Sequence, residues 1–275
     1  MLVILNPDSL GDLIITSLIE NHIKHMVLKS SSFISNLVIA QDKGGAYLVY
    51  YEQKLYIDNI SGLYCGKAKD YKGKFTCSDF MDWYYIQNSW NSYLSYFLAL
   101  IPRQIGVTKS ELWSGSLLQL PCLFKSVEKY GVLCPKYYES YENSLLLEFT
   151  KVGEWYFLET LHAFEFDNFQ RFGAKSILAV EKLGTSWVLL VFIGKSYYAL
   201  INKDGAWGIF SIDVRIVLSM VKFLLSFSLN MAEFLFRYDS LNMKFYCYGM
   251  NLSVSRLILK HYSEDIVKTC RSMIC

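Results

Sequence analysis

The chain has 275 residues, of which 53% are hydrophobic, and a formal net charge of +2 at neutral pH. So little net charge argues against a nucleic-acid partner, because binding a phosphate backbone needs a concentrated basic face. The most apolar stretch, 214–236, is interrupted by Arg215, Lys222 and Glu233, and each charge at the centre of a bilayer costs about 2.5–3.5 kcal/mol. We therefore expect no membrane span. The apolar run before Asn6 carries no basic leader, so we expect a cytoplasmic location.

Two other features of composition have simple interpretations. The seven cysteines are odd in number and scattered, and no two stand at the spacing of structural zinc sites. We expect reduced thiols that pack as small apolar groups. The densest basic cluster, Lys67 to Lys74, is expected to be a solvated loop that could also meet an acidic peptide or a phosphate.

The first hundred residues have the pattern of an α/β unit. Residues 2–5 predict a buried strand, and Asp8 or Ser9 can cap a helix that reaches about His25. A short strand at 26–28 would complete a strand–helix–strand unit, in which the two strands are parallel. The alternation at 47–51 and 55–57 predicts a small hairpin, and 60–64 predicts a further sheet strand.

The segment from Asp79 to about Leu100 is helical in period and rich in aromatic residues, including Trp83 and Trp90. Such a stripe could stack nucleic-acid bases. We favour core or subunit packing, because aromatic residues dominate apolar burial and no basic partners accompany them. Pro102 and Gly106 then break the pattern, which predicts a domain boundary, with one domain at 1–105 and a second at 106–275.

The second half has an α+β pattern. A helix is expected at 117–129 and is stopped by Gly131. Extended segments follow at 145–149, 155–158 and 177–180, and then two strands at 187–193 and 195–201 joined by a tight turn at Gly194. A helix at 216–229, strands at 234–238 and 245–248, and a last helix at 262–273 capped by Ser263 complete the expected order.

Three stretches of this second half resemble the ATP-grasp ligases. They are Leu117 to Pro135, Ile177 to Gly184 (ILAVEKLG) and Ala232 to Asn251 (AEFLFRYDSLNMKFYCYGMN). Within that superfamily the chain is similar to the graspetide or microviridin-type maturases, which crosslink ribosomal peptides through side-chain amides or esters. The resemblance implies an N-terminal pre-ATP-grasp α/β domain followed by a reduced ATP-grasp domain.

The resemblance also implies where magnesium would bind. Active members hold the metal with an acid on one strand and with a glutamate and an asparagine on the next. Here Glu233 stands at the first position and Asn251 at the last, but the middle position falls on Gly249. Losing a carboxylate ligand should cripple a hard-cation site, because charged oxygens supply the affinity. We expect Glu233 and Asn251 to be vestigial ligands.

The nucleotide side of the resemblance is also incomplete. It would place Glu181 against the adenine amino group, with the backbone of Lys182 and Leu183 beside it. Lys151 and Lys175 lie where active members carry phosphate-binding lysines, but the glycine-rich loop expected between them is absent. A solvated surface role explains each lysine equally well.

Other catalytic patterns are missing. There is no P-loop, nucleophile elbow or dinucleotide fingerprint. His22 and His25 are expected to share one helical face and could in principle bind a metal, but no acid or cysteine is fixed beside them.

Our preferred hypothesis is a pseudoenzyme that needs no cofactor. It would bind a peptide or a partner protein, as an accessory subunit of peptide modification in a homo- or hetero-oligomer. The alternative is an active ATP- and magnesium-dependent ligase that joins a carboxylate to an amine or hydroxyl of a peptide. A third interpretation is a structural subunit without a small-molecule ligand.

Overall fold

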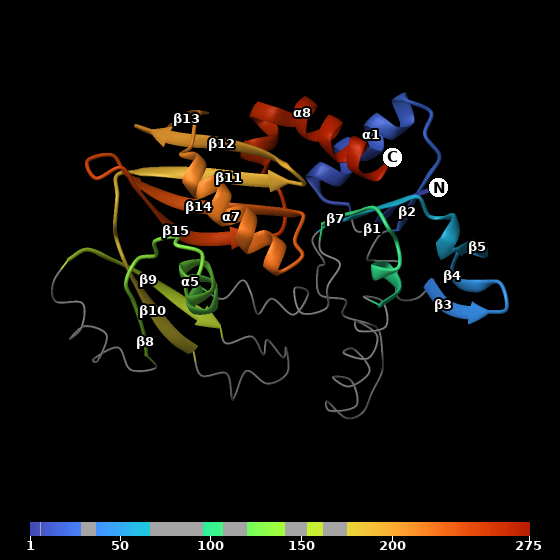
Figure 1. Cartoon of the computed structure of the whole chain (residues 1–275), viewed down its shortest axis with the longest axis horizontal. Coiled ribbons are helices and arrows are strands. Elements are labelled where there is room, and N and C mark those ends of the chain that lie inside the picture. Colours follow the sequence, from blue (N-terminus) through green and yellow to red (C-terminus); the bar gives the residue numbers. More distant parts are fainter. Residues whose placement is uncertain (6, 29–36, 67–95, 107–119, 141–152, 162–174) are drawn as a thin grey trace.

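The computed structural model describes residues 1–5, 7–28, 37–66, 96–106, 120–140, 153–161 and 175–275. At 37–39, 157–161 and 175–177 it describes the backbone only. Four sheets are present in these ranges. Figure 1 shows a larger antiparallel sheet with helices on both faces, and the two ends of the chain close together.

The N-terminal sheet confirms the expected strand–helix–strand unit. Its parallel strands follow the order β2 (His25–Leu28), β1 (Leu2–Leu5), β6 (Gly62–Cys65) and β7 (Gln104–Gly106). Between β1 and β2 runs α1 (Ser9–Glu20), whose N-cap is Asp8. The Asp8 carboxylate accepts the Gly11 N–H at 2.9 Å, as a capping residue should.

The end of α1 corrects the expectation for the two histidines. The helix stops at Glu20 rather than near His25, and His22 has a left-handed backbone with φ of 55°. The Ile23 N–H returns to the Leu18 carbonyl at 2.8 Å, and the His22 N–H returns to Ile19. These two bonds form a Schellman-type cap that closes the helix. His25 therefore begins β2, and the two histidines share no helical face.

A small antiparallel sheet follows β2, in the order β3 (Leu37–Asp42), β4 (Gly45–Tyr50) and β5 (Gln53–Tyr56). The hairpin expected from the alternating pattern is formed by β4 and β5. Tyr51 and Glu52 both have positive φ, which matches the twist of a two-residue hairpin turn. β3 was not expected from the sequence. The 3-10 turn η1 (Ile57–Asn59) leads from β5 toward β6.

The main sheet has five antiparallel strands. They follow the order β13 (Ala206–Ile209), β12 (Ser196–Lys203), β11 (Ser186–Ile193), β14 (Met231–Asp239) and β15 (Lys244–Asn251). The expected pair joined at Gly194 is β11 and β12. On one face, Leu190 and Phe192 share a core with α7 (Val214–Ser226) and α5 (Leu120–Glu128); on the other, Leu189 and Val191 share a core with α1 and α8 (Arg256–Ile274).

A third antiparallel sheet has the order β8 (Tyr137–Ser140), β10 (Lys175–Glu181) and β9 (Trp155–Leu161). Leu178 and Val180 of β10 pack with Phe124 of α5 and with Tyr248 of β15. This cluster joins the β8–β10–β9 sheet to the end of the main sheet, next to the segment that connects β10 to β11 (Figure 1).

The last helix differs from its expected bounds. α8 begins at Arg256, and its N-cap is Ser255 rather than the expected Ser263. The helical backbone is interrupted at Tyr262, where φ is −137°. The Tyr262 hydroxyl donates to the Ala199 carbonyl of β12 at 3.0 Å. A contact with a distant strand accompanies this kink, and local periodicity carries no sign of such a contact.

Some expectations fall outside the described residues. These are the basic cluster at 67–74, the strand at 145–149 and most of the aromatic segment at 79–100. Within the described ranges, no helix is both long and apolar enough to cross a membrane. The six cysteines described are free thiols. Burial raises the pKa of Cys247 and Cys270 to about 12, which fits their expected role as packed apolar groups.

Candidate functional site

The segment Glu181–Gly184, which we name the hinge, links β10 of the β8–β10–β9 sheet to β11 of the main sheet. Its first half is tied to the neighbouring backbone. The Glu181 N–H donates to the Lys136 carbonyl at 2.9 Å, and the Lys182 N–H donates to the Glu154 carbonyl at 2.7 Å. The Lys182 ammonium forms an ion pair with the exposed Glu154 carboxylate, at 3.6 Å.

Tyr248 fastens the hinge from the opposite side. Its hydroxyl donates to the Glu181 carbonyl at 2.5 Å and accepts the Leu183 N–H at 2.8 Å. The side chain is only 8% exposed, and burial is the main reason that the pKa of Tyr248 rises to about 12. The neutral hydroxyl can therefore act as donor and acceptor at once over the whole physiological range.

A β-bulge brings Tyr248 to the hinge. β15 pairs with β14 residue for residue from Asn251 to Gly249, but Leu235 faces Gly249 while Phe236 faces Cys247. Tyr248 is the extra residue between the two registers. A bulge re-aims one side chain and leaves it outside the ladder, so this ring can enter the gap between the two sheets.

Aromatic rings fill that gap. The ring of Tyr248 lies edge to face against Trp187 of β11 at 5.4 Å and against Tyr156 of β9 at 6.3 Å between centroids. The Arg237 guanidinium stacks 4.5 Å from the Trp187 ring and donates to the carbonyls of Leu183 and Gly184 at 3.1 and 2.8 Å. Each of the four hinge residues thus has at least one backbone group bonded within the chain.

The structure brings the two expected metal ligands together. Glu233 and Asn251 are direct cross-strand partners, and Gly249 faces Leu235 one step along the same face. The Glu233 carboxylate is 6% exposed and accepts the Ser255 N–H at 2.9 Å. Burial raises the pKa of Glu233. The Asn251 amide oxygen accepts the Ser253 hydroxyl at 3.1 Å.

These donors do not fit a magnesium ion as they stand. Hard cations need charged oxygens that are free to coordinate, whereas the Glu233 carboxylate serves the N-cap of α8 and burial disfavours its charged form. Among the described residues, no three acidic, histidine or cysteine side chains gather closely enough to hold a metal.

The side chains of the two lysines expected to bind phosphate are not described by the structure. Lys151 lies outside the described residues, and Lys175 begins β10, where only the backbone is described. The contacts of Tyr248 and Arg237 with the hinge were not predicted from the sequence. The aromatic residue directly before Gly249 was the available signal for Tyr248, but its direction depends on the bulge.

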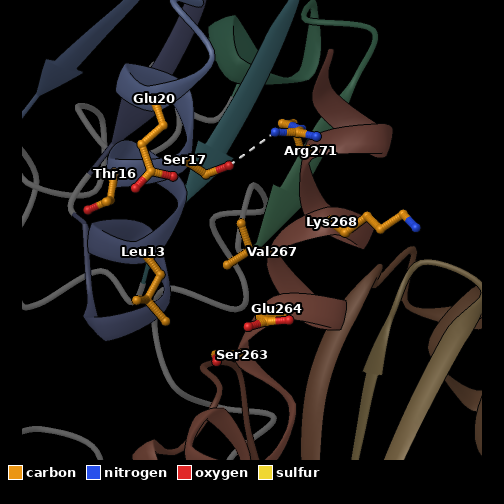
Figure 2. A pocket seen from close by; sticks show the side chains of 9 residues that line it. All are labelled: Leu13, Thr16, Ser17, Glu20, Ser263, Glu264, Val267, Lys268 and Arg271. Atoms are coloured by element: carbon orange, nitrogen blue, oxygen red, sulfur yellow. Dashed lines mark hydrogen bonds between the residues drawn. The ribbon is translucent and has the colours of Figure 1, made fainter.

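A hollow of about 350 Å³ lies between α1 and α8. Figure 2 shows its lining, with Glu20 and Thr16 on one helix and Lys268 and Glu264 on the other. The Arg271 guanidinium bridges the helices by donating to the Ser17 hydroxyl at 3.3 Å. Two acidic side chains, Glu20 and Glu264, and two basic ones, Lys268 and Arg271, line the hollow, so it favours neither anions nor cations.

Two sheets that enclose a hinge, with the main sheet covered by helices on both faces and an α/β sheet before it, define the ATP-grasp fold. Comparison with solved structures supports this assignment over nearly the whole chain. The macrocyclase MdnC from Microcystis aeruginosa MRC, bound with precursor peptide MdnA, has a TM-score of 0.74 at 11% identity, covering 99% of both chains. No protein-family model and no curated protein matches the sequence.

Two further structures have similar scores. A RiPP-associated ATP-grasp ligase from Chryseobacterium gregarium, in complex with ADP and a leader and core peptide, has a TM-score of 0.72 at 12% identity, covering 100% of this chain and 96% of its own. The ATP-grasp ligase PsnB, complexed with minimal precursor, Mg and ADP, has a TM-score of 0.70 at 13% identity, covering 99% and 97%. The fold expected from the sequence is thereby confirmed.

Proposed function

We propose that this chain is a catalytically degenerate ATP-grasp-like protein that binds a peptide or partner protein and acts as an accessory subunit in peptide modification. The state of the Glu233–Asn251 pair carries the first half of the proposal. Gly249, which has no side chain, stands two residues from Asn251 on the same face, and the Glu233 carboxylate accepts the Ser255 N–H. Phosphoryl transfer from ATP relies on metal ions to neutralise the developing charge, and this pair is poorly equipped to hold them.

The peptide half of the proposal is supported by similar proteins. MdnC is bound with a precursor peptide, and the C. gregarium ligase is in complex with a leader and a core peptide. A protein that kept this scaffold and lost its metal ligands could still bind such a peptide.

The surface of α7 offers a place for that partner. Val217, Met220 and Phe223 face the core, whereas Val214, Leu218 and Leu225 are 61%, 56% and 70% exposed. These exposed residues recur at helical spacing and form a second apolar stripe. An apolar stripe of this kind suits the apolar face of an amphipathic peptide.

A thermal-shift titration tests the loss of metal chemistry. We expect magnesium and ATP together to leave the melting temperature of the wild type unchanged. A ligand at about a hundred times its Kd would instead stabilise the fold by about 2.7 kcal/mol. Stabilisation by ATP that depends on magnesium would contradict the proposal and support the alternative, an active peptide ligase.

Gly249→Glu provides a matched gain-of-function control. A Cβ at Gly249 would meet only the Leu235 Cβ, at 3.9 Å, which is ordinary van der Waals contact. The new carboxylate would lie on the face that Glu233 and Asn251 share. We expect magnesium alone to stabilise this variant and not the wild type.

Peptide selection followed by titration tests the binding surface. Peptides selected from a display library on the wild type should lose at least tenfold in affinity with the double variant Leu218→Glu and Leu225→Glu, which corresponds to about 1.4 kcal/mol. Leu241→Glu is the control, because Leu241 is 90% exposed in the turn between β14 and β15. Equal binding by all three proteins would place the peptide elsewhere.

A further inference from the structure

The hinge presents a donor and an acceptor side by side. The Glu181 carbonyl and the Leu183 N–H are two residues apart in the hinge, and a single oxygen atom, the hydroxyl of Tyr248, reaches both of them. The two groups must therefore point into the same space between the sheets. This space is also bordered by the rings of Tyr156 and Trp187.

A donor and an acceptor arranged in this way complement the edge of adenine. The exocyclic amine of adenine donates a hydrogen bond, and the adjacent ring nitrogen accepts one. The Tyr248 hydroxyl does the same, since it donates to Glu181 and accepts from Leu183. We propose that Tyr248 is a built-in substitute for an adenine base, so that the chain keeps an adenine-binding hinge and closes it with its own side chain.

Packing holds this substitute in place. The Tyr248 ring shares a buried cluster with Phe124, Leu178 and Val180, and only 8% of the side chain is exposed. A base could approach the hinge only if this ring left the cluster. Arg237 holds the carbonyls of Leu183 and Gly184 from the main sheet, so removal of Tyr248 leaves the hinge anchored.

This inference goes further than the proposed function, whose first half rests on the metal ligands alone. The two are separable, because adenosine carries no phosphate and needs no metal. Binding of magnesium–ATP by the wild type would end the proposal of catalytic degeneracy. Binding of free adenosine by the wild type would end the proposal made for Tyr248.

Calorimetric titration with adenosine, without magnesium, provides the test. We expect no saturable binding by the wild type and at least a tenfold gain in affinity for Tyr248→Ala, which opens the space and frees both hinge groups. Tyr246→Ala, on the same strand, is the matched control and should behave as the wild type. Inosine should not bind Tyr248→Ala, because its ring N–H and carbonyl oppose the polarity of the hinge.

Two outcomes would overturn the proposal. If Tyr248→Ala binds neither nucleoside, Tyr248 is not what closes the hinge. If it binds adenosine and inosine equally, the variant has gained only a cavity.

Tyr248→Phe gives a readout that does not depend on a large change in packing. Loss of the hydroxyl should speed hydrogen exchange of the Leu183 amide roughly two- to tenfold, the range expected for one hydrogen bond. The Lys182 amide, which donates to Glu154, should keep its rate. An unchanged Leu183 rate would show that the hydroxyl does not hold the hinge.

Discussion

Glu233 has a structural part in the fold. Its carboxylate is buried and accepts the backbone N–H of Ser255, the residue that caps α8. A buried N–H without an acceptor costs about 1–3 kcal/mol. The side chain therefore has a reason to be present that is independent of any metal.

The Glu233 variants should separate charge from hydrogen bonding. Glu233→Ala leaves the Ser255 N–H without its acceptor, and we expect it to lower the free energy of unfolding by about 1–3 kcal/mol. Glu233→Gln keeps an acceptor and should lose much less. Chemical denaturation measures both, and equal losses would contradict a hydrogen-bonding role.

The contribution of the Glu233 carboxyl to stability should depend on pH with a definite sign. Because burial raises the pKa of Glu233 above its ordinary value of 4.5, the folded protein binds this proton more tightly than the unfolded chain does. The carboxyl therefore contributes stability at low pH that is lost as the pH rises from 4.5 through the raised value. Glu233→Gln should lack this loss, so stability curves of the two proteins should diverge toward neutral pH. Parallel curves would contradict the shift.

Asp8 serves two partners with one carboxylate oxygen. That oxygen caps α1 through the Gly11 N–H and also accepts the hydroxyl of Tyr64 at 2.7 Å. Tyr64 is fully buried, and its pKa rises well above the usual value, chiefly through burial. The cap and the buried hydroxyl thus depend on the same atom.

Asp8→Ala should remove both contacts and lower the free energy of unfolding by about 2 kcal/mol or more, given typical values for a lost cap and an unsatisfied hydroxyl. Asp8→Asn retains an acceptor and should be milder. A double-mutant cycle with Tyr64→Phe measures the coupling, and strict additivity would mean that the two side chains do not interact.

Among the elements, the hairpin of β11 and β12 depends most clearly on its turn. Gly194 has φ of +59°, and its N–H donates to the Asn230 carbonyl at 2.7 Å. A Cβ there would lie 2.6 Å from the Met273 sulfur of α8. Both the backbone conformation and the neighbouring helix favour glycine.

Gly194→Ala should lower the free energy of unfolding by about 1–2 kcal/mol, the cost of a left-handed conformation for a residue with a Cβ. Met can move aside, so the strain of the backbone should dominate. Gly208→Ala in β13 is the control, because no atom lies within 4 Å of its Cβ and its φ is ordinary. Denaturation midpoints compare the two, and equal effects would contradict the argument.

At the scale of the whole molecule, α8 joins the N-terminal sheet to the main sheet. One core contains Ile4 of β1, Ile14 of α1, Val191 of β11 and Ile266 of α8. The end of α8 also approaches β6 so closely that a Cβ at Gly62 would lie 2.1 Å from the Ile274 carbonyl oxygen. A shared core of this kind couples the stability of the elements that form it.

Ile266→Ala should therefore destabilise both sheets together. Truncation of a fully buried isoleucine costs about 2–5 kcal/mol. Native-state hydrogen exchange should show a matching loss of protection for the amides of β1 and of β11. A loss confined to one sheet would show that the halves unfold separately, with α8 belonging to only one of them.

The sequence alone determined the order of most elements. Periodicity and turn residues placed β1, α1, the β4–β5 hairpin, β11 with β12, and α7, because these signals are local. The expectation that Gly249 leaves a ligand position empty came from the resemblance and stays a prediction. The ends of α1 and α8 were misjudged, because a Schellman-type cap closes one and a kink beside a bond to β12 interrupts the other.

Only the tertiary structure decided what fills the site. The contact of Tyr248 with the hinge joins residues 67 positions apart in the sequence and depends on a one-residue bulge. The hydrogen bond from the Ser255 N–H to Glu233 likewise requires the loop that leads into α8 to lie beside β14. Such hydrogen bonds follow from strand register and from which sheets face each other. A pattern of residue types along the chain carries neither kind of information.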